Sequence, residues 1–328
     1  MASLTKPGFA MLQPLFITSG QINQNANYRE LVEVLRAAFR SDITTPMRHH
    51  HDFPNPPNEK DSTLLLMPAW DAGKSLGVKI AGVFPDNGKL GLPAIQATYI
   101  LLDGRTGELK AIMEGKNLTV TRTAAASALA SDYLSRADSG SLFMIGAGAL
   151  APHLILAHAA VRPIGQVYVW GRNPASAARL CESLADQPFD IRPVEDIPTG
   201  MAMADIISCA TLSPDPLVLG RYLKPGQHID LVGSYKKNTR EADDETILNA
   251  EIFVDTYQGA LVETGDLAIP LATGVLERSA VKAELSELCS GQKPGRVSGS
   301  AITLFKSVGH ASEDLAAANY FYSKIVRK

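Results

Sequence analysis

The chain has 328 residues, enough for about two domains of roughly 150 residues each. Its 31 lysines and arginines against 34 acidic residues give a net charge of −3 with no basic tract, so we expect no nucleic-acid partner. Three widely spaced cysteines favour free thiols in a reducing compartment, and hence a cytoplasmic protein. The apolar segment 9–17 is interrupted by Gln13 and Pro14 and is too short for a membrane span, so we expect no membrane partner.

The first part of the chain combines one helix with several strands. Leu31, Val34, Leu35 and Ala38 recur at helical spacing and predict an amphipathic helix over 28–40. Short runs rich in β-branched and apolar residues predict strands at 63–67, 76–83, 97–102 and 109–113, with a hairpin turn over 103–107. The segment 49–62, rich in proline and asparagine, is expected to form a loop near the site.

From about Leu118 the pattern changes to helix and strand in alternation. Helices are predicted over 121–134, 150–161 and 175–184, and strands over 142–145, 167–170, 205–209, 228–233 and 251–255. Such alternation predicts an α/β fold built on a Rossmann, doubly wound parallel sheet with right-handed crossovers. A last helix over 313–327, separated from this region by 305–309, is expected to return to the first domain. The predicted division is therefore 118–303 for the Rossmann domain and 1–117 plus 304–328 for a smaller mixed α/β domain.

A glycine turn follows the strand at 142–145. It has the form Gly146-x-Gly148-x-x-Ala151, in which the first glycine allows a tight turn, the second lets backbone N–H groups approach a phosphate, and the small third residue lets the helix pack closely. A helix N-terminus favours anions. The turn therefore predicts a dinucleotide pyrophosphate site, formed by Gly146, Ala147, Gly148, Ala149 and Leu150.

The next strand bears on the choice of cofactor. It ends in Gly171-Arg172-Asn173, where an NAD-specific fold usually has an acidic residue for the ribose. Arg172 favours a 2′-phosphate and hence NADPH, with NADH left open; the alternative is an ordinary solvated arginine. Because ligands lie beyond the carboxyl ends of parallel strands, further cofactor-binding residues are expected there. They are Asn173, Ser176, Ala210, Thr211, Leu212, Val232, Gly233 and Ser234.

Several other polar residues have two interpretations. Lys306 is expected either to contact the cofactor or substrate at the domain junction or to cap the last helix. The run 241–245 is expected to begin a helix, and the isolated histidines to serve in packing. The triplet His49-His50-His51 does not have the spacing of a metal site, so no metal is expected, although one of these histidines is suited to relay protons.

Motifs along most of the chain resemble the ornithine cyclodeaminase and mu-crystallin family. They agree with it in order and spacing as well as in chemistry. They are Pro46-Met-Arg48, Met67-Pro-Ala69, Leu76-Gly-Val-Lys79, Gln96-Ala-Thr98, Thr121-Arg-Thr-Ala-Ala125, Gly146-Ala-Gly148, Lys224-Pro-Gly226, His228-Ile229, Gly233, Glu241-Ala-Asp-Asp244, Gly265-Asp266 and Phe305-Lys-Ser-Val-Gly309.

The resemblance implies a homodimer that acts on the imine of a small α-amino acid. By motif, Arg48, Lys79 and Arg122 match the positions that hold the substrate carboxylate in the family, Met67 falls beside the substrate, and Thr121 beside the cofactor. A guanidinium pairs bidentately with a carboxylate, which suits that role. The alternative is three salt-bridged surface cations.

One position separates the family's chemistries. Cyclodeaminases typically read Gly-Gly-Asp where this chain reads Gly233-Ser234-Tyr235, and a phenol with a pKa near ~10 is a poor base at neutral pH. The resemblance is therefore to the ketimine reductase branch, which implies reduction of Δ1-pyrroline-2-carboxylate to L-proline and also of Δ1-piperideine-2-carboxylate to L-pipecolate. Ornithine cyclodeaminase, alanine dehydrogenase and a non-catalytic NADPH- or ligand-binding protein stay open as alternatives.

The expected mechanism has Arg48 and Arg122 clamp the carboxylate while hydride reaches the protonated imine. Lys79 is a candidate for polar assistance at the nitrogen or the carboxylate. The Ser-His pair that mu-crystallin has before Gln-Ala-Thr is replaced here by Ala94-Ile95, so the proton donor must be water or another residue.

Overall fold

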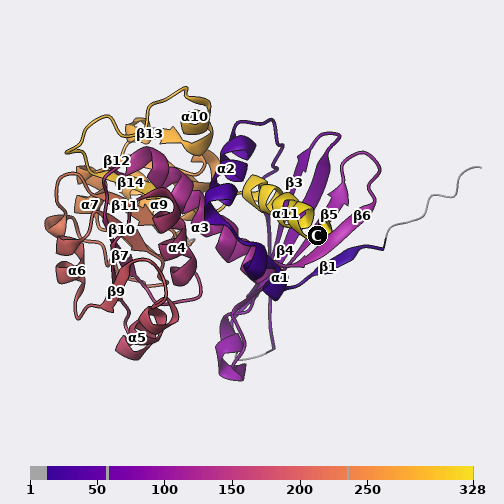
Figure 1. The fold of residues 1–328 in the computed structure, drawn as a ribbon, viewed down its shortest axis with the longest axis horizontal. Coiled ribbons are helices and arrows are strands. Elements are labelled where there is room, and N and C mark those ends of the chain that lie inside the picture. The colour runs from indigo at the N-terminus through magenta and orange to yellow at the C-terminus, as the bar shows by residue number, and fades with distance from the viewer. Residues whose placement is uncertain (1–12, 57–58, 235, 328) are drawn as a thin grey trace, which may run out of the picture.

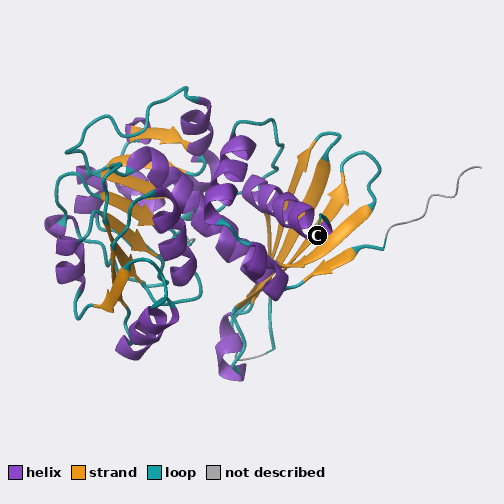
Figure 2. Ribbon diagram, in the orientation of Figure 1, coloured by secondary structure: helices purple, strands orange, loops and turns teal. Residues whose placement is uncertain are grey.

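The computed structural model describes residues 13–56, 59–234 and 236–327. Two sheets, each in its own half of the molecule, form the frame (Figure 1). The smaller half holds a mixed six-stranded sheet and the larger half a parallel eight-stranded sheet covered by helices on both faces (Figure 2). This architecture confirms the predicted α/β fold.

The six-stranded sheet has the order β1-β6-β5-β4-β3-β2. Its neighbours are antiparallel except for β1 and β6, which are parallel. Its strands are β1 (Leu15–Ile17), β2 (His49–Phe53), β3 (Ser62–Asp71), β4 (Ser75–Val83), β5 (Ile95–Asp103) and β6 (Leu109–Glu114). The four predicted strands are β3 to β6. In the predicted turn over 103–107, Asp103 Oδ1 accepts hydrogen bonds from the N–H groups of Arg105 and Thr106.

The prediction of a loop over 49–62 was wrong for its first five residues. His49–Phe53 is β2, an edge strand paired in antiparallel register with β3. Its residues are all exposed, so the alternation of buried and exposed side chains that identifies a strand in a sequence is missing.

The eight-stranded sheet has the order β13-β12-β14-β11-β10-β7-β8-β9, with every neighbouring pair parallel. The order reverses direction between β7 and β10, which is the switch point where such folds bind ligands. Its strands are β7 (Ser141–Ile145), β8 (Gln166–Trp170), β9 (Asp190–Pro193), β10 (Ile206–Cys209), β11 (His228–Leu231), β12 (Glu251–Val254), β13 (Val281–Glu284) and β14 (Thr303–Lys306).

β14 lies where the sequence was expected to leave this domain. It pairs with β11 on one side and β12 on the other, so it is an inner strand of the parallel sheet. The predicted boundary between residues 303 and 304 lies inside it. The chain crosses to the smaller half only after Lys306, and α11 (Ala311–Val326) then packs on β3, β4 and α2 (Tyr28–Phe39).

The helix α3 (Gly115–Leu134) joins the two halves. It packs against α2 and α11 on one side and against α4 (Ala151–Val161) on the other. Alanines at 124, 125, 126, 128 and 130 are all buried, because small side chains let a helix be enclosed on every face. The helix begins at Gly115, earlier than the predicted Thr121, because the Glu114 carboxylate accepts the N–H groups of Lys116 and Asn117.

The remaining helices are short. They are α1 (Ser19–Asn25), α5 (Pro174–Ser183), α6 (Ile197–Met203), α7 (Asp244–Asn249), α8 (Tyr257–Glu263), α9 (Gly265–Thr273), α10 (Leu285–Ser290) and the 3-10 turns Pro85–Leu90, Gly220–Tyr222 and Arg278–Ala280. The cysteines Cys181, Cys209 and Cys289 are buried free thiols, as predicted. Within the described ranges no helix has the length and apolar character needed to cross a bilayer.

Candidate functional site

The glycine turn after β7 lies at the switch point of the parallel sheet. Gly146 has φ +114°, and a Cβ there would lie 2.7 Å from the carbonyl oxygen of Ala210 at the end of β10. Only glycine satisfies both conditions. Gly148 and Ala149 are exposed just before α4, and a Cβ on Gly148 would meet nothing within 4 Å. An open turn at a helix N-terminus is suited to hold a pyrophosphate, so these residues fit the predicted dinucleotide.

The end of β8 presents Arg172 and Asn173 on the surface. The Asn173 side chain accepts the N–H of Ala175 and so caps α5. Ser176 accepts a hydrogen bond from Arg179 at 2.9 Å. An exposed arginine after the second strand of this fold has the location that a 2′-phosphate contact requires.

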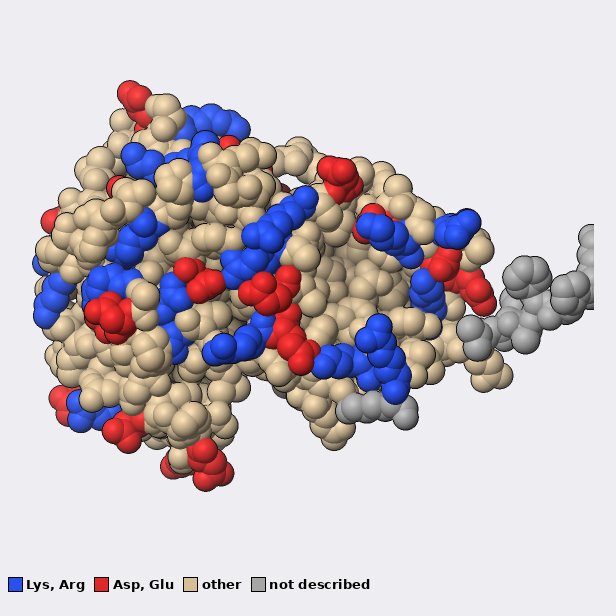
Figure 3. All heavy atoms as spheres, turned by 45° about the horizontal axis from the view of Figure 1, so that its top comes forward, with Lys and Arg blue, Asp and Glu red and all other residues tan. Residues whose placement is uncertain are grey.

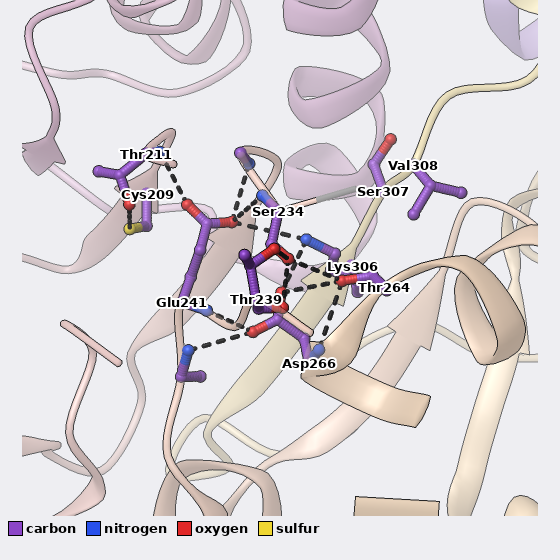
Figure 4. A network of polar contacts seen from close by, with 12 residues as sticks. Cys209, Thr211, Ser234, Thr239, Glu241, Thr264, Asp266, Lys306, Ser307 and Val308 are labelled. Atoms are coloured by element: carbon purple, nitrogen blue, oxygen red, sulfur yellow. Dashed lines mark hydrogen bonds and ion pairs between the residues drawn. The ribbon is translucent and has the colours of Figure 1, made fainter. Parts of the chain in front are cut away.

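The loops after β10 and β11 are held together by a buried glutamate (Figure 4). Glu241 accepts the N–H of Thr211 at 2.9 Å, that of Gly233 at 2.8 Å and that of Ser234 at 3.1 Å. These bonds fix the backbone at the carboxyl ends of both strands, where Ala210, Leu212 and Val232 also lie. The prediction that the run 241–245 begins a helix is confirmed, because Asp243 caps α7 and Asp244 and Glu245 stand in its first turn, while Glu241 is fully buried just before it.

Lys306 belongs to the same network. Its side chain is completely buried, with Nζ 2.9 Å from Asp266 and 3.5 Å from Glu241. Lys306 is the last residue of β14 and His310 is the N-cap residue of α11, so Lys306 does not cap that helix. Lys306 instead balances the two buried carboxylates, which would be costly without a cation.

A cavity of about 1020 Å³ lies between the two halves of the molecule. The smaller half contributes Arg48, His50, Thr63 and Leu65 among others, and the larger half Thr256, Tyr257 and Glu263. His310 and Ser312, at the start of α11, also line it. The cavity adjoins the ends of β11 and β12, so it lies at the same edge of the parallel sheet as the glycine turn.

Arg48 is the predicted carboxylate ligand that lines this cavity. Its NH2 group donates to the carbonyl oxygens of Gly309 at 2.6 Å and Val308 at 3.2 Å, and pairs with Glu263 at 3.2 Å. The side chain is 14% exposed, so the guanidinium is held in place and still accessible.

Lys79 and Arg122 are paired with carboxylates of α11, and Arg122 lies against Gly309. Lys79 Nζ is 2.7 Å from Asp314, Arg122 Nε is 2.8 Å from Asp314, and Arg122 NH1 is 2.7 Å from Glu313. All four side chains are at most 5% exposed, so they are not surface cations. The Arg122 guanidinium lies so close to Gly309 that a Cβ there would be 2.6 Å from NH1.

Burial shifts the pKa values of two groups in this cluster of buried ion pairs, Lys79 and Glu313. It lowers the pKa of Lys79 to about 8, against the attraction of Asp314, and raises the pKa of Glu313 to about 7, against the attraction of Arg122. The repulsion of Arg122 and Arg48 also lowers the pKa of Lys79, which indicates that the three cations act on one region.

The remaining residues that were predicted from the sequence lie in several different places. Met67 and Thr121 are buried, and Met67 lines a small extension of the cavity beside Arg48. His49 and His51 stack edge to face on β2. Across the described residues no group of three metal-binding side chains is found. Tyr235, on which the choice between reductase and cyclodeaminase was based, lies outside the described residues.

The sequence reasoning missed four acidic residues of the site: Glu241, Glu263, Glu313 and Asp314. Glu313 and Asp314 stand in the first turn of a helix, where acids are common and carry no sign of a role. Two buried cations predicted in one cleft imply anions to balance them, and that signal could have directed the search to the last helix.

Comparison with known proteins covers nearly the whole chain. The ornithine cyclodeaminase/mu-crystallin family model matches residues 13–328. A Δ(1)-pyrroline-2-carboxylate reductase of Colwellia psychrerythraea is 37% identical over 94% of this chain and 98% of its own length. Protein SAR DEFICIENT 4 of Arabidopsis thaliana is 41% identical over 93% of this chain and 95% of its own. The Thermococcus litoralis Δ(1)-pyrroline-2-carboxylate reductase, solved with NADH and L-proline, has a TM-score of 0.89 and 34% identity, covering 95% of this chain and 98% of that one.

Proposed function

Because the chain belongs to the ornithine cyclodeaminase/mu-crystallin family, we propose that it is an enzyme that reduces Δ1-pyrroline-2-carboxylate to L-proline with NAD(P)H. Δ1-Piperideine-2-carboxylate, reduced to L-pipecolate, is the proposed second substrate. The two rings differ by one methylene, which a pocket distinguishes by only ~1–3 kcal/mol.

The observation that carries this proposal is the cation cluster at the cavity. Arg48 lines the cavity with an accessible guanidinium, Arg122 lies against Gly309, and Lys79 shares Asp314 with Arg122. A planar carboxylate bound to Arg48 would gain two parallel hydrogen bonds. This holds the ring of a 2-carboxylate imine at one orientation in the cavity, and positioning of that kind supplies much of the rate in hydride transfer.

NADPH is the proposed cofactor, and its chemistry is the supply of the hydride. The turn at 146–150 would hold the pyrophosphate, Arg172 the 2′-phosphate, and the loops after β10 and β11 the remainder. The exposure of Arg172 supports the phosphate contact. The Thermococcus litoralis relative was solved with NADH, which keeps NADH as the alternative.

The proposed working form is a homodimer in the cytoplasm. Large apolar side chains of the smaller half are exposed, including Phe16 at 67% and Leu90 at 74%, and a second copy would cover such side chains. Figure 3 shows blue and red side chains intermixed over the visible face, in keeping with a small-molecule enzyme rather than a nucleic-acid-binding protein.

The test is consumption of NADPH with each imine at neutral pH, alongside ammonia release from L-ornithine with NAD⁺ and NADH oxidation with pyruvate plus ammonia. The proposal expects rapid NADPH oxidation with the cyclic imines and little activity in the other assays. Ammonia and proline from ornithine, without net cofactor consumption, would make the chain a cyclodeaminase.

A further inference from the structure

Glu263 is an acid placed directly on the proposed substrate-binding arginine. It is the last residue of α8, in the larger half, and its Oε2 lies 3.2 Å from NH2 of Arg48, in the smaller half. Both side chains line the cavity, Glu263 with 21% of its side chain exposed. The pair therefore spans the cleft at the point where the substrate carboxylate is proposed to bind.

Two other titratable groups of the cavity wall, Glu284 and His310, already have hydrogen-bond partners. The Glu284 carboxylate accepts the N–H of Tyr257 at 2.8 Å and the hydroxyl of Ser286 at 2.7 Å. The two ring nitrogens of His310 are hydrogen-bonded to Thr45 and Ser312, at 2.8 and 2.7 Å. Glu263 differs from both because its ion pair is with the residue that the substrate itself would engage.

We propose that Glu263 is the general acid that protonates the imine nitrogen of the substrate, an inference that rests on the proposed function. In a 2-carboxylate cyclic imine the nitrogen is bonded to the carbon that carries the carboxylate. An acid that contacts the arginine binding that carboxylate is therefore beside the nitrogen as well. Hydrogen-bond reach in a plausible substrate position is the first requirement of a general acid.

The charges around Glu263 make its protonation depend on substrate binding. Burial raises the pKa of Glu263, while Arg48, His50 and Lys237 oppose this and Asp255 reinforces it. When the substrate carboxylate takes over Arg48, Glu263 loses its main counter-charge and gains a negative neighbour. Both changes raise its pKa further, so the bound complex takes up a proton.

The bonds balance in two steps. The O–H bond of Glu263 breaks and an N–H bond forms at the ring nitrogen, which leaves a carboxylate and an iminium cation. Hydride then forms a C–H bond at the imine carbon, the C=N π electrons become the nitrogen lone pair, and NADPH is oxidised to NADP⁺. A proton from the solvent then restores the acid form of Glu263.

The first test compares Glu263→Gln with wild type in NADPH oxidation with Δ1-pyrroline-2-carboxylate. The amide keeps the shape of the side chain and cannot supply the proton, so kcat should fall by about 100-fold or more. Asp61→Asn, at an exposed position on the cavity rim, removes the same charge and should keep wild-type kcat. An unchanged kcat with a lower KM would make Glu263 merely a competitor for Arg48 and would overturn the proposal.

The second test does not depend on turnover. 2-Furoate is a planar ring carboxylate that cannot accept hydride and whose ring oxygen is not basic. Its binding, followed by calorimetry in buffers of different ionisation enthalpy, should take up about one proton more per site in wild type than in Glu263→Gln. Equal proton uptake in the two proteins refutes the inference. A wild type that binds 2-furoate with proton uptake but leaves the imines unreduced refutes the proposed function instead.

Discussion

Arg48, Lys79 and Arg122 are similar in charge and different in surroundings. Arg48 is accessible from the cavity, whereas Lys79 and Arg122 are buried on Glu313 and Asp314. The family motifs predicted all three, because motif positions report residue type and order. Their burial was not predictable, because it depends on a helix that begins more than 180 residues later, as the separation of 191 between Arg122 and Glu313 shows.

Replacing Arg48 by alanine tests whether its guanidinium binds the substrate carboxylate. Loss of a charged hydrogen-bonded contact costs about 1.5–3 kcal/mol, so KM for the imine should rise roughly 10- to 100-fold. KM for NADPH should change little, because Arg48 lies in the smaller half. Steady-state kinetics with each substrate varied in turn measures both, and an unaltered KM for the imine would remove Arg48 from the site.

The lowered pKa of Lys79 predicts a pH limit. Below about pH 8 the side chain is charged and attracts the substrate carboxylate; above it the charge is lost. The inhibition constant of 2-furoate should therefore increase, which means weaker binding, as the pH rises through about 8. The Lys79→Arg protein keeps its positive charge above pH 8, so its inhibition constant for 2-furoate should increase less. A Lys79→Arg profile that matches wild type would show that another group sets the limit.

Arg172 is the residue that tests cofactor choice. Arg172→Ala removes a proposed contact to the 2′-phosphate worth about 1.5–3 kcal/mol, so the preference for NADPH over NADH should fall roughly 10- to 100-fold. Arg179→Ala, also exposed and on α5, removes the same charge and serves as the control. The comparison is made on kcat/KM for the two cofactors, and an equal ratio in all three proteins would leave Arg172 an ordinary surface arginine.

At the scale of elements, periodic patterns predicted the amphipathic helix α2, the strands β3 to β6 and most of the alternating region. The errors fall on elements whose neighbours decide their structure. The place of β14 between β11 and β12 comes from pairing with strands distant in the sequence, which its own four residues do not report. All residues of β2 are exposed, so its sequence shows no alternation of buried and exposed side chains.

Substitutions of Gly146 and Gly148, in the same turn, should differ in their effect on stability and agree in their effect on NADPH binding. Gly146→Ala should cost about 1–3 kcal/mol of stability, because it strains a left-handed backbone and presses on Ala210. Gly148→Ala has open space around its Cβ and should change stability by no more than about 0.5 kcal/mol. Both should weaken NADPH binding, as measured by fluorescence titration alongside urea unfolding. A Gly148→Ala protein with unchanged affinity would place the pyrophosphate elsewhere.

At the scale of the whole molecule, the site is divided between the two halves. The larger half holds the glycine turn and Glu263, the smaller half holds Arg48 and Lys79, and α3 and α11 bring Arg122, Glu313 and Asp314 to the junction. The fold class and both halves were predictable from local pattern. The cavity and the acids that balance its cations were not, because they exist only where the two halves meet.

The proposed reductase activity is tested most directly by the stoichiometry of one reaction: NADPH oxidised and L-proline formed from Δ1-pyrroline-2-carboxylate at neutral pH. We expect one L-proline for each NADPH, with turnover strongly reduced in Arg48→Ala. NADPH that stays reduced in the presence of the imine, while binding to the protein is intact, would contradict the proposal.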